Sequence, residues 1–143
     1  MSILLSVVHI MDKVKEMQVM NDVSPGARNA LISGGSSGIG LALAQGFATA
    51  GYNVIAAGLG PLPHSTPSIR FARLDVTDGP AVAALVTELP ELDVVVNAAG
   101  IIRREDEFDP DIFAQVIDIN LNGTMRICTA ARAALAKRNG SII

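Results

Sequence analysis

One glycine- and serine-rich segment constrains the fold of this chain more than any other feature. It reads Ser33-Gly34-Gly35-Ser36-Ser37-Gly38-Ile39-Gly40. An apolar run at 29–33 precedes it, and apolar residues at helical spacing follow it as far as Ala50. A glycine-rich turn between a buried strand and a helix is the context that a phosphate-binding loop requires, although a plain structural turn has the same composition.

Each glycine of the segment has a specific expected task. Gly34 permits a sharp turn off the strand, and Gly40 lets the helix pack closely against it. Gly38 lets the backbone approach a pyrophosphate without a side chain in the way. The backbone N–H groups of residues 37–39, at the positive end of the helix, then face the phosphates.

The rest of the chain continues the alternation of strand and helix. We expect strands at 52–57, 69–74, 93–97 and 141–143, and helices at 80–89 and 110–138, the last with an irregularity near Gly123. The strand at 93–97 is rich in valine and is expected to be buried on both faces. This pattern predicts an α/β fold with a Rossmann-like, doubly wound parallel sheet, truncated at about the fifth strand.

Length and composition agree with one such domain. The 143 residues are 50% hydrophobic but only 3% aromatic, so the core must be aliphatic. We assign 28–143 to an NAD(P)-binding Rossmann domain, incomplete at its C-terminus, and 1–27 to an N-terminal extension that lies upstream of a later start such as Met11, Met17 or Met20. The apolar stretch at 3–11 is too short to span a membrane.

Charge and cysteine content argue against several classes of function. The net charge is −3 and no basic patch is visible, so no nucleic-acid partner is expected. The single cysteine, Cys128, allows no intrachain disulfide, and with two distant histidines it forms no metal site. We therefore expect a cytoplasmic protein without a metal and without a membrane anchor.

The spacing Gly-x-x-x-Gly-x-Gly resembles the cofactor motif of the short-chain dehydrogenase/reductase family, with Ser33 where threonine is usual. Three further motifs match that family in order: Asp75-Val76 after the third strand, Asn97-Ala98-Ala99-Gly100 after the fourth, and Asn120 in the long helical segment. The resemblance covers about residues 28 to 143.

The resemblance implies an oxidoreductase that transfers hydride between NAD or NADP and a small-molecule alcohol or carbonyl substrate, and an intact form that is a homo-oligomer. It implies that Asp75 contacts the adenine ring, and that Asn120 kinks its helix and holds a water of the catalytic proton relay. Each of these side chains also has a purely structural interpretation as a turn, cap or helix residue. The implied cofactor-binding set is Gly34, Ser36, Ser37, Gly38, Ile39, Gly40, Asp75, Val76, Asn97, Ala98, Ala99 and Gly100.

The residues that perform the chemistry in this family are missing. The family uses a tyrosine and a lysine four positions later, with a serine at the end of the fifth strand. The only tyrosine, Tyr52, starts a predicted strand and is followed at that distance by Ala56. We therefore expect the 143-residue chain to be inactive, although it keeps its cofactor contacts. Two alternatives remain: a non-catalytic nucleotide-binding half-domain, or an unstable gene fragment.

The sequence leaves the choice between NAD and NADP open. An NAD enzyme usually has an acid at the end of the second strand, but residues 57–60 contain none. Ser37 and Leu59 stand where a cation for NADP is usual. Arg70 and His64 are the nearest substitutes, and we expect Arg70 to lie on a solvated face and His64 in a loop.

Overall fold

The computed structural model describes residues 26–89, 91–106 and 108–143. The predicted extension at 1–27 therefore lies almost wholly outside the described residues. Within them, the elements follow one another as strand and helix in the predicted order.

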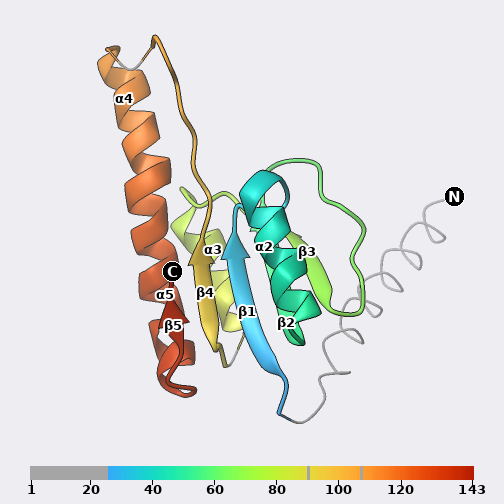
Figure 1. The fold of residues 1–143 in the computed structure, drawn as a ribbon. Coiled ribbons are helices and arrows are strands. Elements are labelled where there is room, and N and C mark those ends of the chain that lie inside the picture. The colour runs from blue at the N-terminus through green and yellow to red at the C-terminus, as the bar shows by residue number, and fades with distance from the viewer. Residues whose placement is uncertain (1–25, 90, 107) are drawn as a thin grey trace, which may run out of the picture.

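Five parallel strands form the sheet, in the order β3-β2-β1-β4-β5 (Figure 1). Their bounds are β1 Arg28–Ser33, β2 Tyr52–Gly58, β3 Ile69–Arg73, β4 Val94–Asn97 and β5 Ser141–Ile142. The order reverses between β1 and β4, because the chain first builds outward to β3 and then crosses to the other side of β1. This confirms the predicted doubly wound parallel sheet and creates a switch point, where such sheets bind ligands.

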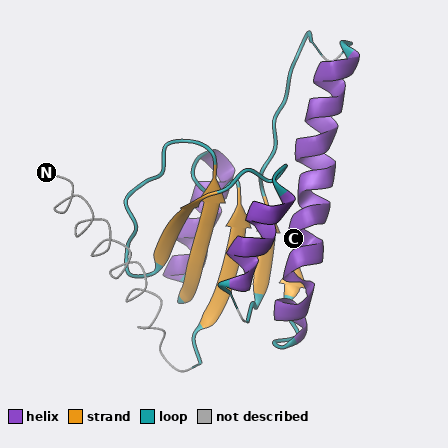
Figure 2. Cartoon of the chain, turned by 180° about the vertical axis from the view of Figure 1, so that it is seen from behind, coloured by secondary structure: helices purple, strands orange, loops and turns teal. Residues whose placement is uncertain are grey.

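The strands carry apolar side chains on both faces of the sheet, and helices bury both faces. Leu31, Ile55 and Val95 belong to one buried cluster, together with side chains of α3 (Gly79–Thr87) and α5 (Thr124–Ala136). Residues of opposite parity on β1, β2 and β4 belong to a second cluster beneath α2 (Gly38–Thr49). Figures 1 and 2 show α2 on one side of the sheet and α3 and α5 on the other. The valines of β4 divide between the two clusters, as the sequence predicted.

The helical segment after Pro110 is one long rod with a defect inside it. It consists of α4 (Pro110–Ile117), a π-helical turn η1 (Asp118–Gly123) and α5. Asp109 caps α4 by accepting hydrogen bonds from two backbone N–H groups, at 2.8 and 3.2 Å. The irregularity predicted near Gly123 is therefore confirmed, and its form is a turn with one residue more than an α-helical turn would hold.

Close packing fixes the position of η1 against the end of β3. A Cβ on Gly123 would lie 2.6 Å from Cγ2 of Val76, so only glycine permits this approach. The Arg126 guanidinium spans the same contact, donating to the carbonyl oxygens of Val76 at 3.4 Å and Asp118 at 3.3 Å. The sequence contains no direct signal of this contact, since the two segments are far apart along the chain.

The side chain of Arg70 differs from its predicted surroundings. Arg70 was expected on a solvated face, but its side chain is only 17% exposed and pairs with Glu88 at 3.0 Å. That prediction was wrong, because the C-terminal end of α3 supplies a carboxylate beside β3. Cys128 is partly buried, and its Sγ accepts a hydrogen bond from Asn97 at 3.4 Å. No helix in the described ranges is long and apolar enough to cross a membrane.

The central position of Leu31 yields a test of the fold. Leu31 is fully buried in β1, between β2 and β4. Leu31→Ala is expected to lower the free energy of unfolding by about 2–5 kcal/mol, because the cavity it leaves cannot collapse within a flanked strand. Urea denaturation followed by circular dichroism measures the change. The control is the same substitution at Leu62, which is 39% exposed in the loop after β2. Equal losses at both positions would contradict the described core.

Candidate dinucleotide-binding site

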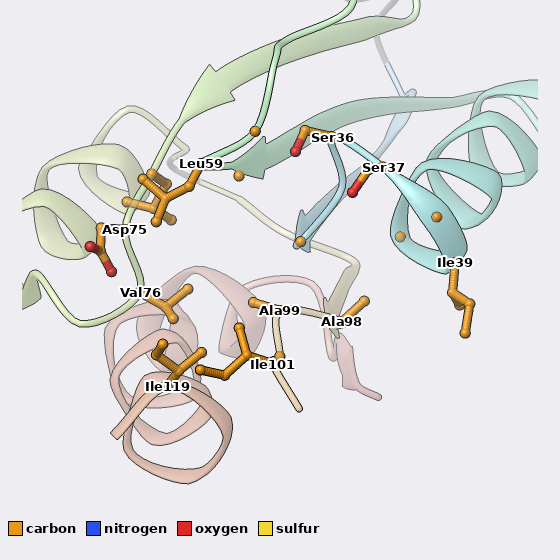
Figure 3. Close-up of a pocket in the computed structure, with 17 residues that line it drawn as sticks. Ser36, Ser37, Ile39, Leu59, Asp75, Val76, Ala98, Ala99, Ile101 and Ile119 are labelled. Atoms are coloured by element: carbon orange, nitrogen blue, oxygen red, sulfur yellow. The ribbon is translucent and has the colours of Figure 1, made fainter. Parts of the chain in front are cut away.

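A cavity of about 370 Å³ lies at the carboxyl ends of the strands, at the switch point of the sheet (Figure 3). Segments that follow β1, β2, β3 and β4 all contribute to its wall, together with η1. The residues that line it are Gly34, Ser36, Ser37, Gly38, Ile39, Gly40, Gly58, Leu59, Gly60, Leu74, Asp75, Val76, Ala98, Ala99, Gly100, Ile101 and Ile119.

Two close contacts between backbone segments shape the turn after β1, and each depends on a glycine that has no side chain. Gly34 has φ +69°, and a Cβ there would lie 2.5 Å from the carbonyl oxygen of Ala98. A Cβ on Gly40 would overlap the carbonyl oxygen of Gly34. The turn therefore presses against the segment after β4 on one side and the first turn of α2 on the other. These are the tight turn and close helix packing predicted for these glycines.

The N-terminus of α2 opens onto the cavity, and its first N–H groups have no partner among the described residues. Ser37 is the N-cap residue, and its side chain makes no capping hydrogen bond. Its carbonyl accepts the first helical bond, from Leu41 N–H at 3.0 Å, so the preceding N–H groups lack helical partners. Nothing lies within 4 Å of where a Cβ of Gly38 would be. This open, positively polarised backbone fits the pyrophosphate of a dinucleotide.

Asp75 is a turn residue, and it also lines the cavity. One carboxylate oxygen accepts hydrogen bonds from the Thr77 N–H at 2.9 Å and the Thr77 hydroxyl at 2.8 Å, which makes it a turn residue. It also lines the cavity beside Val76, and Figure 3 shows both side chains at the wall near Leu59. Its second carboxylate oxygen has no hydrogen-bond partner among the described residues, which leaves that atom to accept from a ligand.

Asn120 anchors the loop after β4 rather than lining the cavity. Its Oδ1 accepts from the Ile101 N–H at 2.8 Å, and its Nδ2 donates to the Ile101 carbonyl at 2.9 Å. Its own carbonyl accepts from the Thr124 hydroxyl at 2.9 Å. The predicted position in a helix irregularity is confirmed, since Asn120 lies within η1. The reciprocal pair of hydrogen bonds holds Gly100 and Ile101 at the cavity wall.

Asn97 also lies outside the cavity lining. Its Nδ2 donates to the carbonyl of Ile143 at 3.3 Å and to Sγ of Cys128 at 3.4 Å. The side chain thus connects β4 to the segment after β5 and to α5. The remainder of the Asn97-Ala98-Ala99-Gly100 motif does reach the cavity.

Several lining residues have no counterpart among the residues predicted to bind. Gly58, Leu59 and Gly60 follow β2, Leu74 follows β3, and Ile101 and Ile119 approach from the loop after β4 and from η1. We considered the end of β2 in the sequence only for the acid and the cation that it lacks. The general rule that ligands contact residues after every strand near a switch point would have found the first four. Ile119 depends on the placement of η1.

An ion pair stabilises the π-helical turn behind the site. Arg126 Nη2 lies 2.7 Å from Oδ1 of Asp118, which also accepts from Asn122 Nδ2 at 3.1 Å. The hydrogen bond from Arg126 is the main reason that the pKa of Asp118 lies below its usual value, and the Asn122 bond contributes further. Among the described residues no group of histidine, cysteine or carboxylate side chains is arranged to hold a metal.

Known proteins resemble the chain over this whole region. The sequence profile of the short chain dehydrogenase family matches residues 28–143, which is most of the chain. The chain belongs to the short-chain dehydrogenase family. Members of this family use NAD or NADP, so the cavity geometry and the family agree on the kind of ligand.

Curated relatives from bacteria give the same result. The chain is 37% identical over 127 residues to a 3-oxoacyl-[acyl-carrier-protein] reductase, MabA, of Mycobacterium avium; the match covers 82% of this chain and 48% of the relative. It is 33% identical over 129 residues to a 3beta-hydroxysteroid dehydrogenase of Mediterraneibacter gnavus, covering 79% and 47%. The chain spans about half the length of these relatives.

Solved structures confirm the fold. A short chain dehydrogenase/reductase family protein aligns with a TM-score of 0.68 and 32% identity, over 80% of this chain and 53% of that one. The aldohexose dehydrogenase of Thermoplasma acidophilum aligns with a TM-score of 0.67 over 78% and 44%; at 24% identity it supports the fold alone.

The Asp118–Arg126 pair predicts a specific pH response. Because folding lowers the pKa of Asp118, its contribution to stability is present at neutral pH and is lost as the pH falls through the lowered pKa. Arg126→Gln is expected to raise this pKa toward the usual aspartate range. Carboxyl-carbon NMR titration of both proteins measures it. An unchanged Asp118 titration would refute the assigned interaction.

Proposed function

We propose that this chain forms the cofactor-binding half of an NAD(P)-dependent oxidoreductase acting on an alcohol or carbonyl substrate. The observation that supports this most strongly is the cavity at the switch point, where a glycine-rich turn and the uncapped N-terminus of α2 meet the ends of four strands. Membership of the short-chain dehydrogenase family supports the class of reaction.

In this proposal the lining residues divide the dinucleotide between them. Backbone groups of Ser37, Gly38 and Ile39 bind the pyrophosphate, and Gly34 and Gly40 hold that backbone in place. Asp75 accepts from the adenine amino group, with Val76 against the ring. Ala98, Ala99 and Gly100 contact the remaining part of the cofactor. When bound, NAD(P) accepts or donates the hydride.

The two asparagines have positioning roles in the proposal. Asn120 keeps residues 100–101 at the cavity wall through its paired bonds to Ile101. Asn97 holds β4 to the segment after β5 and to α5, so its contribution to cofactor binding is indirect. Neither assignment requires these side chains to touch the ligand.

The proposal treats turnover separately from binding. The tyrosine–lysine pair that donates and relays the proton in this family has no match in the 143 residues, whose single tyrosine, Tyr52, packs edge-on against Phe47. We therefore expect the chain alone to bind cofactor without reducing a carbonyl.

The relatives named for 3-oxoacyl and 3beta-hydroxysteroid substrates suggest the substrate class of the whole protein. We further propose that the whole protein is a homo-oligomer in the cytoplasm.

Titration of the purified 143-residue chain with NADH and NADPH tests binding. Saturable enhancement of nicotinamide fluorescence is expected, with cooperative thermal unfolding by circular dichroism and a rise in the unfolding temperature at saturating ligand. Binding without turnover on any carbonyl substrate would also fit a purely nucleotide-sensing module. A folded chain that binds neither dinucleotide overturns the proposal, and a chain without cooperative unfolding favours the unstable-fragment alternative.

One substitution can separate the role of the α2 N-terminus in phosphate binding from its contribution to the stability of the protein. Ser37→Asp is expected to leave the free energy of unfolding unchanged or to raise it by about 0.5 kcal/mol, since an acid is favourable at an N-cap. The same carboxylate should weaken NADH binding by about tenfold or more, through repulsion of the pyrophosphate. Ser37→Asn is the neutral control of equal size. Equal NADH binding by both variants would show that the pyrophosphate does not bind beside residue 37.

A further inference from the structure

We infer that the adenosine end of this cavity selects NAD(H) over NADP(H), with the Ser36 hydroxyl taking the place of the acid that usually recognises the ribose 2′-hydroxyl. This inference rests on the proposed function and concerns one part of the same cavity: the end of β2, where dinucleotide-binding sheets distinguish a 2′-hydroxyl from a 2′-phosphate.

The first observation is the surroundings of Ser36. Ser36 is only 7% exposed, yet it lines the cavity and its hydroxyl has no hydrogen-bond partner among the described residues. A Cβ on Gly58 would overlap its Oγ, and one on Gly60 would lie 3.5 Å away. The hydroxyl therefore occupies the space that an acidic side chain at the end of β2 would otherwise use.

The second observation is the charge of the cavity wall. Of the described residues that line it, only Asp75 is ionisable, and no lysine, arginine or histidine contributes. Arg70 is committed to Glu88 at 3.0 Å, and His64 does not reach the cavity. A 2′-phosphate would enter without a counter-ion and near a carboxylate, which is costly. A 2′-hydroxyl needs only one neutral partner, and Ser36 can donate or accept.

Arg73 is the one cation that the sheet places near this point. It is in register with Gly58, but it is exposed and does not line the cavity. Alternation along β3 puts it on the face of Ile69 and Phe71, which is also the face on which Gly58 meets Ser36. Because its side chain is exposed and lies outside the cavity lining, the inference assigns Arg73 no part in recognition of the ribose, and the test below includes its substitution.

The test measures the affinity of the complete 143-residue chain for NADH and for NADPH by nicotinamide fluorescence. Calorimetry then compares binding of ADP-ribose with binding of 2′-phospho-ADP-ribose. NADH is expected to bind about tenfold or more tightly than NADPH, which corresponds to one unpaired phosphate. Arg73→Gln should leave that ratio unchanged. Ser36→Ala should weaken NADH binding by about three- to tenfold and NADPH binding less, since a neutral hydrogen bond is lost.

A substitution that supplies a cation provides the converse test. Leu59 lines the cavity and is 50% exposed, so Leu59→Arg should fold normally and strengthen NADPH binding by about tenfold or more through a charge-assisted hydrogen bond. The matched control is Leu62→Arg, which adds the same charge to the same loop outside the cavity lining.

The outcomes separate the two proposals. Failure of either dinucleotide to bind the folded chain overturns the proposed function, and this inference with it. Binding with NADPH equal to or tighter than NADH leaves the proposed function standing and overturns the inference alone. A preference for NADPH that Arg73→Gln abolishes would also identify Arg73 as the phosphate ligand in place of the neutral recognition inferred here.

Discussion

The close approach of three backbone segments determines the candidate site. The turn after β1 touches the carbonyl of Ala98 at Gly34, while Gly40 brings the first turn of α2 onto that same turn. Neither approach tolerates a Cβ, so both depend on residue identity. Because strand, turn and helix are fixed together, the free N–H groups of α2 point at the crevice where the strand order reverses. The other contacts of the site supply walls around this arrangement.

The parts of the fold that arise from local patterning could be predicted from the sequence. Apolar runs gave the strands to within about two residues, and the glycine-rich turn indicated where the first helix begins. Even the defect near Gly123 was expected, and the structure supplies its form and its neighbour. Most of the residues predicted to bind do line one cavity, which is consistent with their coming from loops at one edge of a parallel sheet.

What the sequence could not supply depends on distant partners. Arg70 faces a carboxylate from α3, and no local pattern pairs those two positions. Asn120 and Asn97 follow the motif order but bond to backbone groups that only the tertiary fold brings to them. The crowding of Ser36 against Gly58 is likewise invisible along the chain, since it requires β1 and β2 to be in register. Periodicity reports burial and element type, whereas the direction of each side chain depends on packing.

The π-helical turn has a consequence for how this region can vary. Each residue added to or removed from an α-helix rotates everything beyond it by about 100°. The extra residue within η1 therefore sets the relative rotation of α4 and α5, and Asn120 is bonded to Ile101 in the register that results. A one-residue deletion between Asp118 and Gly123 would give a more regular helix and turn α4 with its exposed Phe113 to a different direction. Apart from Gly123, where a Cβ would meet Val76, the residues of η1 should accept substitutions more readily than changes of length.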